Sequence, residues 1–296
     1  MSVLENKIDF VAVVSVRNAN PNGDPLNGNR PRTNYDDFGE ISDVCIKRKI
    51  RNRMQDMGQS IFVQSDSRKN DTYDCLSKRA SGVLGKIKDK EEYAKRACEE
   101  WLDVRTFGQV FAFKATDKDG VSVGVRGPVS IHLADSVFPV EVETMQITKS
   151  VNSEPGEKKT SDTMGMKHFV RYGVYLIKGT INVQLAEKTG FSQEDADVMK
   201  ECLRTLFVND ASSARPEGSM EVVKLFWWKH HCKEGQYSSA KVHRSLKVEQ
   251  REKVVQPDGS LNEAYQNNIV IADCLENYAI VLEPMDGLEP EIIDGI

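Results

Sequence analysis

Residues 8–17, IDFVAVVSVR, decide the fold class, because their centre is β-branched and apolar on both alternating faces. Such a strand is typical of the middle of a sheet, where other elements cover both sides. The next stretch, residues 18–40, reads NANPNGDPLNGNRPRTNYDDFGE and is crowded with turn-forming residues. It predicts a long loop, and loops of this length inside a domain are usually functional or disordered.

A helix is predicted after this loop, with a cap at Ser42, an end near Met57 and a stop at Gly58. At about 100° per residue its apolar side chains form one stripe, and its polar side chains gather on the far side. Lys49 and Arg53 fit this division poorly. The stripe consists of Ile46, Ile50, Met54 and Met57, and the far side of Lys47, Arg48, Arg51 and Gln55.

The rest of the chain continues the alternation of strands and helices. A capping box, Ser192 with Asp195, predicts the start of a second helix. With the first strand and helix, the further elements give the order β-α-β-β-α-β, which is the ferredoxin-like order shared by the RRM. The further elements of this order are a strand near 128–134, a strand over 172–186, a helix over 192–207 and a strand over 220–230. A further strand over 240–249 follows them.

We therefore expect an α+β fold in which residues 1–296 form a single elaborated domain. Two insertions interrupt the core, a finger-like helical region near 58–126 and an arm near 143–170. The arm segment 145–168 is too hydrophilic to be buried, and ordering it costs about 1–2 kcal/mol per residue without much apolar burial.

Composition narrows the class of protein. With 39% hydrophobic residues the chain is not disordered, and its apolar runs are too short for a membrane span. Six scattered cysteines without a C-x-x-C pair, and no secretion signal at the N-terminus, predict a cytoplasmic protein. The net charge of −5 is uneven: residues 254–296 hold nine acidic and no basic side chains, leaving 40 basic against 36 acidic before them. A polyanion ligand is therefore compatible with the charge.

Catalytic and cofactor motifs are absent from the sequence: it contains no nucleophile elbow, P-loop, H-E-x-x-H or dinucleotide fingerprint, so no cofactor is predicted. His230, His231 and Cys232 are adjacent, but neighbouring strand residues point to opposite faces and cannot easily share a metal ion. Among the loop acids, Asp24, Asp36 and Asp37 could attract a divalent ion, although shaping turns is the commoner role of such residues. No catalytic residue and no metal site is predicted.

Four segments carry a resemblance to a known family, and the basic helix is the first of them, ISDVCIKRKIRNR (residues 41–53). The others are DVRTFG (103–108), RGPVSIHLADSVFPVEVE (126–143) and TMGMKHFVRYGVYLIKGTINVQL (163–185). Together they resemble the Cascade backbone subunit, the seventh family of CRISPR-associated proteins in the RAMP superfamily. The loop NPNGDP…GNRPR and the length are most similar to the type I-C branch, and the resemblance covers about residues 8 to 250.

The resemblance implies a non-catalytic RNA-binding protein that polymerises head to tail along a CRISPR guide RNA as a helical filament. Its implied partners are the guide RNA, the target DNA strand paired to it, further copies of itself, and a guide-end cap subunit with large and small subunits. The arm would be a thumb whose apolar wedge is Met164 or Met166. The implied RNA-binding residues are Arg17, Asn20, Arg30, Arg32, Ser42, Lys47, Arg48, Arg51, Lys149, Met164, Met166, Lys167, His168 and Arg171.

Two alternatives remain open from the sequence. Related subunits of type III complexes use an Asp in the loop after the first strand. A metal-dependent RNA endonuclease that uses Asp24 is therefore an alternative function. The other alternative is an unrelated ferredoxin-like protein whose basic helix only keeps it in solution, since a charge run on a helix is usually a solvated face.

Overall fold

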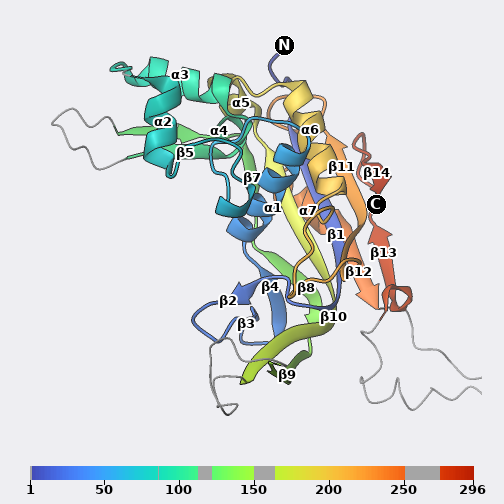
Figure 1. Cartoon of the computed structure of the whole chain (residues 1–296). Helices are drawn as coiled ribbons and strands as arrows, with labels where there is room; N and C mark the ends of the chain where they lie inside the picture. Colours follow the sequence, from blue (N-terminus) through green and yellow to red (C-terminus); the bar gives the residue numbers. More distant parts are fainter. Residues whose placement is uncertain (1, 86, 113–121, 150–163, 251–273) are drawn as a thin grey trace, which may run out of the picture.

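The computed structural model describes residues 2–85, 87–112, 122–149, 164–250 and 274–296. Its largest element is a mixed-length antiparallel sheet with the strand order β14-β11-β1-β10-β8-β4, in which β7 and β9 also pair with β10 (Figure 1). These strands are β1 (Ile8–Ala19), β4 (Phe38–Ile41), β7 (Val129–Ile131), β8 (Ala134–Pro139), β9 (Val142–Thr148), β10 (Met164–Ile181), β11 (Met220–Lys229) and β14 (Glu291–Asp294).

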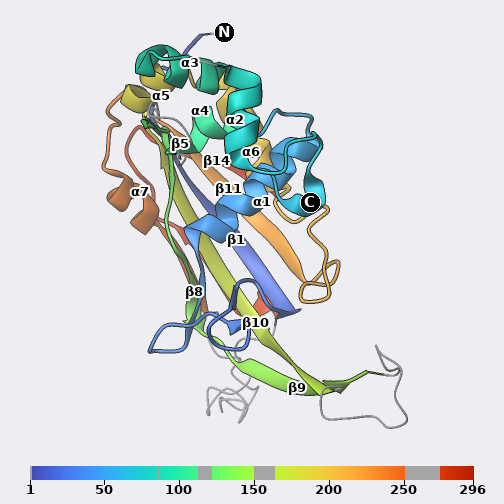
Figure 2. The same ribbon diagram turned by 60° about the vertical axis from the view of Figure 1, so that its left-hand side comes forward.

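Strand β1 lies in the middle of this sheet, antiparallel to both β10 and β11, as its two-faced apolar pattern predicts. Phe10 and Val14 point to the face covered by helices α1 (Asp43–Asp56) and α6 (Gln193–Arg204). Val11 and Val13 point to the opposite face, under helix α7 (Ser239–Ser245) and the hairpin of β12 (Leu246–Gln250) and β13 (Tyr278–Leu282). The sheet is thus buried on both faces, with α1 and α7 on opposite sides in Figure 2.

Both predicted helix starts are confirmed. The Ser42 side chain accepts a hydrogen bond from the backbone of Cys45, and α1 ends one residue before Met57. Ser192 and Asp195 form the expected capping box at the start of α6. The predicted apolar stripe of α1 is buried against the sheet through Ile46, Ile50 and Met54.

Two predicted strands are partly wrong. Strand β10 ends at Ile181, and residues Val183–Thr189 form helix α5, because the Asn182 side chain caps the backbone of Leu185. Residues Ser239–Ser245 form α7 before β12 begins, and Ser238 caps that helix. In both places a capping side chain starts a short helix in a segment whose apolar residues alternate along the sequence.

The insertion near 58–126 has a small core of its own. It contains α2 (Leu76–Leu84), α3 (Lys90–Glu100), α4 (Leu102–Phe107) and the hairpin of β5 (Gly108–Phe111) with β6 (Val123–Arg126). Phe62, Trp101 and Phe111 pack their rings together inside it, with centroids 4.6 to 6.4 Å apart. These elements lie at the end of the molecule opposite β9 (Figure 1).

The arm is a two-stranded ribbon formed by β9 and the outer half of β10, which projects from the main sheet (Figure 2). Its register runs from Met164 opposite Thr148 to Val170 opposite Val142. Residues 150–163 of the expected arm lie outside the described part of the chain.

At the other sheet edge, the acidic C-terminal strand β14 pairs with β11, and Glu291 binds Lys200. Across the described ranges, no helix combines the length and the apolar character needed to span a lipid bilayer.

Candidate nucleic-acid interface

Asparagine side chains form hydrogen bonds across the loop between β1 and α1. The buried Asn20 donates to the carbonyl of Asn29 at 2.6 Å, across the small hairpin of β2 (Gly23–Asp24) and β3 (Arg30–Pro31). The side-chain oxygen of Asn22 accepts from both the backbone N–H and the hydroxyl of Ser42, at 2.9 and 2.8 Å. Asn20 and Ser42 therefore stabilise the loop and fix it to the first turn of α1.

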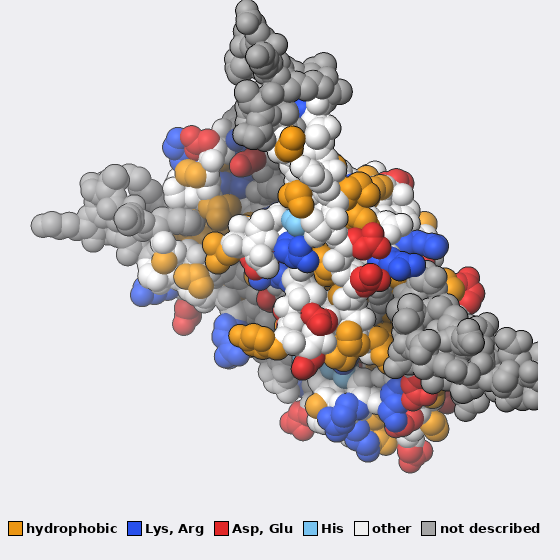
Figure 3. All heavy atoms as spheres, turned by 90° about the horizontal axis from the view of Figure 1, so that it is seen from below, with side chains coloured by type: hydrophobic (Ala, Val, Ile, Leu, Met, Phe, Trp, Pro, Cys, Tyr) orange, Lys and Arg blue, Asp and Glu red, His pale blue; other side chains and the backbone are white. Residues whose placement is uncertain are grey.

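A three-residue joint connects this loop to the root of the arm. Nη1 of Arg30 donates to Oγ1 of Thr144 at 2.9 Å and lies 3.3 Å from Nδ1 of His168. The Thr144 hydroxyl lies 2.9 Å from the same ring nitrogen. Arg30 can only donate, so its contact with Nδ1 is a hydrogen bond in the tautomer in which that nitrogen accepts. Figure 3, seen from the arm end, shows histidine and basic side chains side by side there.

Asp24 takes part in the turn after β1. Its carboxylate accepts from the backbone of Leu26 at 3.2 Å and pairs with Arg32 at 3.3 Å. Asp37 and Glu40 line the same hollow of about 360 Å³. Nevertheless, within the described ranges no group of three His, Cys, Asp or Glu side chains is arranged to hold a metal ion.

Most polar side chains on the far side of α1 have partners within the protein. Arg51 pairs with the fully buried Asp103 at 2.8 Å and lies over the ring of Phe107, with its guanidinium carbon 5.0 Å from the ring centroid. Lys47 pairs with Asp43 at 2.9 Å within the helix. The 58–126 insertion packs over this side of α1, which is why the polar stripe faces protein. Lys49 is buried and pairs with Asp210.

Arg48 differs from its neighbours on α1. Its guanidinium donates to the carbonyl of Val63 at 2.7 Å, and no carboxylate among the described residues lies within 4.0 Å of it. Burial and the adjacent charge of Arg51 lower the pKa of Arg48, while Asp103 opposes that shift. Asp103 pairs with Arg51 alone, so Arg48 has no carboxylate partner of its own.

The two faces of the arm differ in chemistry. Because alternate residues of a strand point to the same face, Met164 and Met166 lie on the face of His168, and their side chains are 56% and 57% exposed. The opposite face carries Met145 and Ile147, also about half exposed. Figure 3 shows these apolar side chains along the arm. Met164 Sδ accepts from Nε2 of Gln146 at 3.2 Å across the ribbon, and the four apolar side chains are otherwise about half exposed on the two faces of the arm.

The remaining predicted contact residues lie around the arm and the end of β1. Arg17 is exposed near the end of β1, and Arg171 is exposed and pairs with Glu141 at 3.4 Å. Lys167 lies on the arm face opposite the two methionines, and Lys149 follows β9. The structure thus gathers most of the predicted residues at the arm end, and it places Arg48 and Arg51 further along α1.

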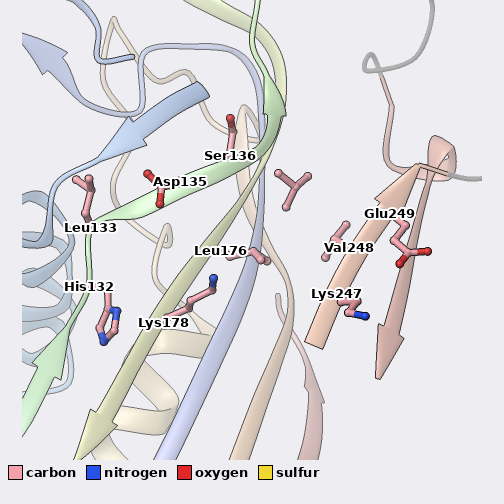
Figure 4. Close-up of a pocket in the computed structure, with 10 residues that line it drawn as sticks. His132, Leu133, Asp135, Ser136, Leu176, Lys178, Lys247, Val248 and Glu249 are labelled. Atoms are coloured by element: carbon pink, nitrogen blue, oxygen red, sulfur yellow. The ribbon is translucent and has the colours of Figure 1, made fainter. Parts of the chain in front are cut away.

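Two further features do not resemble a polyanion site. His230 and His231 diverge as predicted: His230 is buried against Asp9 at 2.8 Å, whereas His231 bonds the carbonyl of Gly287. A hollow of about 470 Å³ between β8, β10 and β12 has mixed charge, as Figure 4 shows. Its charged lining consists of Lys178, Lys247, Asp135 and Glu249, and His132 also lines it.

The comparison with protein families decides the affiliation of the chain. The family model described as CRISPR-associated protein Cas7 matches residues 6–270. The chain belongs to the Cas7 family. A curated relative, the CRISPR-associated protein Cas7 of Haloferax volcanii, is 29% identical over 209 residues. That match covers 65% of this chain and 61% of the relative's own length.

Solved structures similar to this Cas7 chain include chains of two assemblies. One, titled CRISPR RNA-guided surveillance complex, pre-nicking, has a TM-score of 0.46 and 15% identity, and covers 75% of this chain and 78% of that chain. The other, titled CRISPR RNA-guided surveillance complex, has a TM-score of 0.42 and 19% identity, and covers 75% and 68%.

Sequence reasoning missed three residues that organise the site of this Cas7 chain. Thr144 completes the joint with Arg30, and Asn22 receives both groups of Ser42. Asp103 pairs with Arg51 across 52 residues. Asp103 is the first residue of the segment DVRTFG. The sequence shows that this segment resembles a family motif, but it does not show that Asp103 pairs with Arg51. Thr144 and Asn22 have no local signal, because single polar residues in a loop or strand are common.

Proposed function

We propose that this Cas7 chain is the guide-RNA-binding backbone subunit of a type I Cascade complex, and that several copies assemble along one CRISPR RNA. Family membership carries this proposal. The arm supports it, since a projecting ribbon with exposed methionines and a cationic joint at its root suits a wedge between nucleotides. Apolar wedges inserted between bases are a known way to unstack a nucleic acid strand.

The proposed RNA contacts hold the phosphate backbone rather than the bases. Guide sequences differ, so a protein that presents them must leave the base edges free for pairing. Cations at the arm end and on α1 suit this task. We propose as contacts Arg17, Arg30, Arg32, Lys47, Arg48, Lys149, Met164, Met166, Lys167, His168 and Arg171, with Asn20 and Ser42 holding the loop that carries them.

The sheet itself is not the proposed RNA platform. In RRM proteins, aromatic side chains on an open sheet face stack on bases. Here α7 and the β12–β13 hairpin cover the face that carries Phe226 and Trp228. The strand order β11-β1-β10-β7, with α1 and α6 between strands, supports the proposal of a ferredoxin-like core inside a single domain with insertions near 58–126 and 143–170.

The proposal also covers the subtype, the partners, the location and the absence of catalysis. The loop NPNGDP…GNRPR supports the type I-C branch. We propose the target DNA strand, a cap subunit and large and small subunits as partners, a cytoplasmic location, and a role without catalysis. Asp24 is engaged by the turn and by Arg32, so the ribonuclease alternative is not adopted.

Binding of unrelated single-stranded RNA sequences to the full chain tests the proposal. We expect similar affinities for all sequences and a steep loss of affinity with rising salt, because phosphate contacts release counterions. Strong discrimination between sequences, or no binding at low salt, would contradict the proposal.

A further inference from the structure

The hollow between β8, β10 and β12 runs along one edge of the β12–β13 hairpin. Figure 4 shows Val248 of β12 on one side of it and Leu176 of β10 on the other. Of the described residues that line it, none belongs to β13. The hollow therefore borders the edge of β12 that faces away from β13, and its volume of about 470 Å³ is in the range of binding clefts.

The backbone along this edge of β12 has no strand partner. The N–H of Glu283 donates to the carbonyl of Ser245 at 2.8 Å, and the register places these two residues directly opposite each other. Hydrogen-bonded pairs alternate along an antiparallel ladder, so Lys247 and Val281 form the next such pair. Val248 consequently directs its N–H and carbonyl away from β13. No other described strand pairs with β12, and an open edge of this kind can accept a further strand.

Side chains on the two faces of β12 differ in chemistry. Val248 belongs to the apolar cluster between the hairpin and the main sheet, against which Leu176 and Val137 also pack. Lys247 and Glu249 point to the opposite face, because neighbouring residues of a strand alternate. A strand added at this edge would therefore place every second side chain against Leu176 and Val137, and the others beside Glu249.

The charges around the hollow favour a basic partner. Lys247 forms a salt bridge with Glu283, so these two charges balance each other. Asp135, Glu249 and Lys178 have no salt bridge to any described residue, which leaves two carboxylates against one ammonium group. This excess of negative charge attracts Lys or Arg side chains and opposes phosphate groups.

We propose that the open edge of β12 and the hollow beside it bind an extended segment of another protein, which adds a third strand to the β12–β13 hairpin. Apolar side chains of the segment face Leu176 and Val248, and Lys or Arg side chains alternate with them on the face of Glu249. In this mode of recognition, main-chain hydrogen bonds give affinity and alternate side chains give specificity. The inference does not depend on RNA binding, because the hollow shares no residue with the proposed RNA contacts.

Two labelled peptides of equal composition test the proposal on the full chain. One peptide of about eight residues alternates Val and Lys, and the other carries the same residues as a Val block followed by a Lys block. Fluorescence anisotropy should show saturable binding of the alternating peptide and about ten-fold weaker binding of the block peptide, because only the former places Val on one face and Lys on the other. Equal affinities, or no binding of either peptide, would overturn the proposal.

Hydrogen exchange locates the peptide on the chain. The amide of Val248 should exchange fast in the free chain and about ten-fold slower or more when the alternating peptide is bound. The amide of Lys247 faces β13 and should stay protected in both states. Protection of Val248 in the free chain would show that another segment of the chain, or a second copy, already occupies the edge, and this result would also overturn the proposal.

Variants separate the backbone contact from the charges. Val248→Pro removes the outward N–H without touching the β12–β13 ladder, and proline is tolerated on edge strands. It should lower affinity for the alternating peptide roughly five-fold or more, whereas Val248→Thr keeps the N–H and should bind as the unmodified chain does. Asp135→Asn combined with Glu249→Gln should lower the affinity about three-fold or more, and the surface control Lys78→Gln should not. If Val248→Pro does not fold, the charge variant and the exchange of Val248 decide; an unchanged affinity in the charge variant contradicts the proposal.

Competition with RNA distinguishes this surface from the proposed RNA contacts. A mixed-sequence single-stranded RNA should not displace the alternating peptide, since two carboxylates at the hollow oppose phosphate. Displacement by RNA with loss of the exchange protection at Val248 would assign the hollow to RNA and overturn the proposal.

Discussion

Arg30 and Thr144 are 114 positions apart in the sequence, yet Nη1 of Arg30 donates to Oγ1 of Thr144 at 2.9 Å. The contact joins the hairpin after β1 to the root of the arm, with His168 as the third member. The proposed phosphate contacts of the loop and the proposed wedge of the arm therefore belong to one local unit. We expect a change at this joint to affect RNA binding more than folding.

Thr144→Val should weaken RNA binding while the melting temperature stays nearly constant. The valine keeps the shape and removes the acceptor for Arg30. A hydrogen bond to a charged group contributes roughly 1.5–3 kcal/mol to stability, and the exposed position of this one makes its effect on the fold smaller. We expect RNA affinity to fall by up to about ten-fold, because Arg30 loses the acceptor that orients it. Fluorescence anisotropy with labelled RNA measures the change. Thr144→Ser keeps the hydroxyl and should bind as the unmodified chain does; equal weakening in both variants would contradict the joint.

Replacing the exposed methionines of the arm tests the wedge. Met164→Gln combined with Met166→Gln should not lower the melting temperature, because both side chains are more than half exposed. It should weaken RNA binding by about ten-fold or more, since apolar burial of each side chain is lost on binding. The matched control exchanges both residues for Leu, which keeps the apolar volume. Unchanged affinity in the Gln variant would show that this face of the arm does not contact the RNA.

Asp24→Asn separates RNA binding from RNA cleavage. The amide oxygen can still accept from the backbone of Leu26, so we expect a folded protein. RNA incubated with Mg²⁺ and either protein should remain intact over the same time, as judged on a denaturing gel. If the unmodified chain cleaves RNA and the Asp24→Asn variant does not, the ribonuclease reading replaces ours.

The success and failure of sequence reasoning have a common physical cause. Helix α1 was predicted with its cap and stripe because Ser42 and the apolar residues act locally. The partners of its far side could not be predicted, since Arg51 meets Asp103 from a distant insertion. Periodicity shows which side chains are polar, but it does not show whether water or another polar segment faces them.

The short helix α5 was missed for a different reason. An alternating pattern predicted a strand through residues 183–186, where the Asn182 cap produces α5 instead. This cap is a local signal, but asparagine is also common in strands and turns, so the alternation outweighed it. The family resemblance, by contrast, depends on four separate segments, and the family match confirms it.

Stability should fall in mildly acidic solution partly through His243. Burial lowers the pKa of His243 below its ordinary value of 6.5, although Asp9 opposes this; His132 and Lys178 lower it further. The unfolded chain then binds more protons than the folded chain just below about pH 6.5, so acid favours unfolding. His243→Gln keeps a donor for the carbonyl of Gly179 but does not titrate. Its melting temperature should fall less than that of the unmodified chain between about pH 7 and pH 5.5; an equal fall would exclude His243 as a source of the pH dependence.

The central claim, that copies of this chain assemble along a guide RNA, is tested most directly by the mass of the RNA complex as the RNA is lengthened. Light scattering after size exclusion gives this mass for a series of single-stranded RNAs at low salt. Our account predicts that the mass rises in steps of one 33.3 kDa chain as the RNA grows. A complex that holds one chain on every RNA length, or no complex at all, would contradict it.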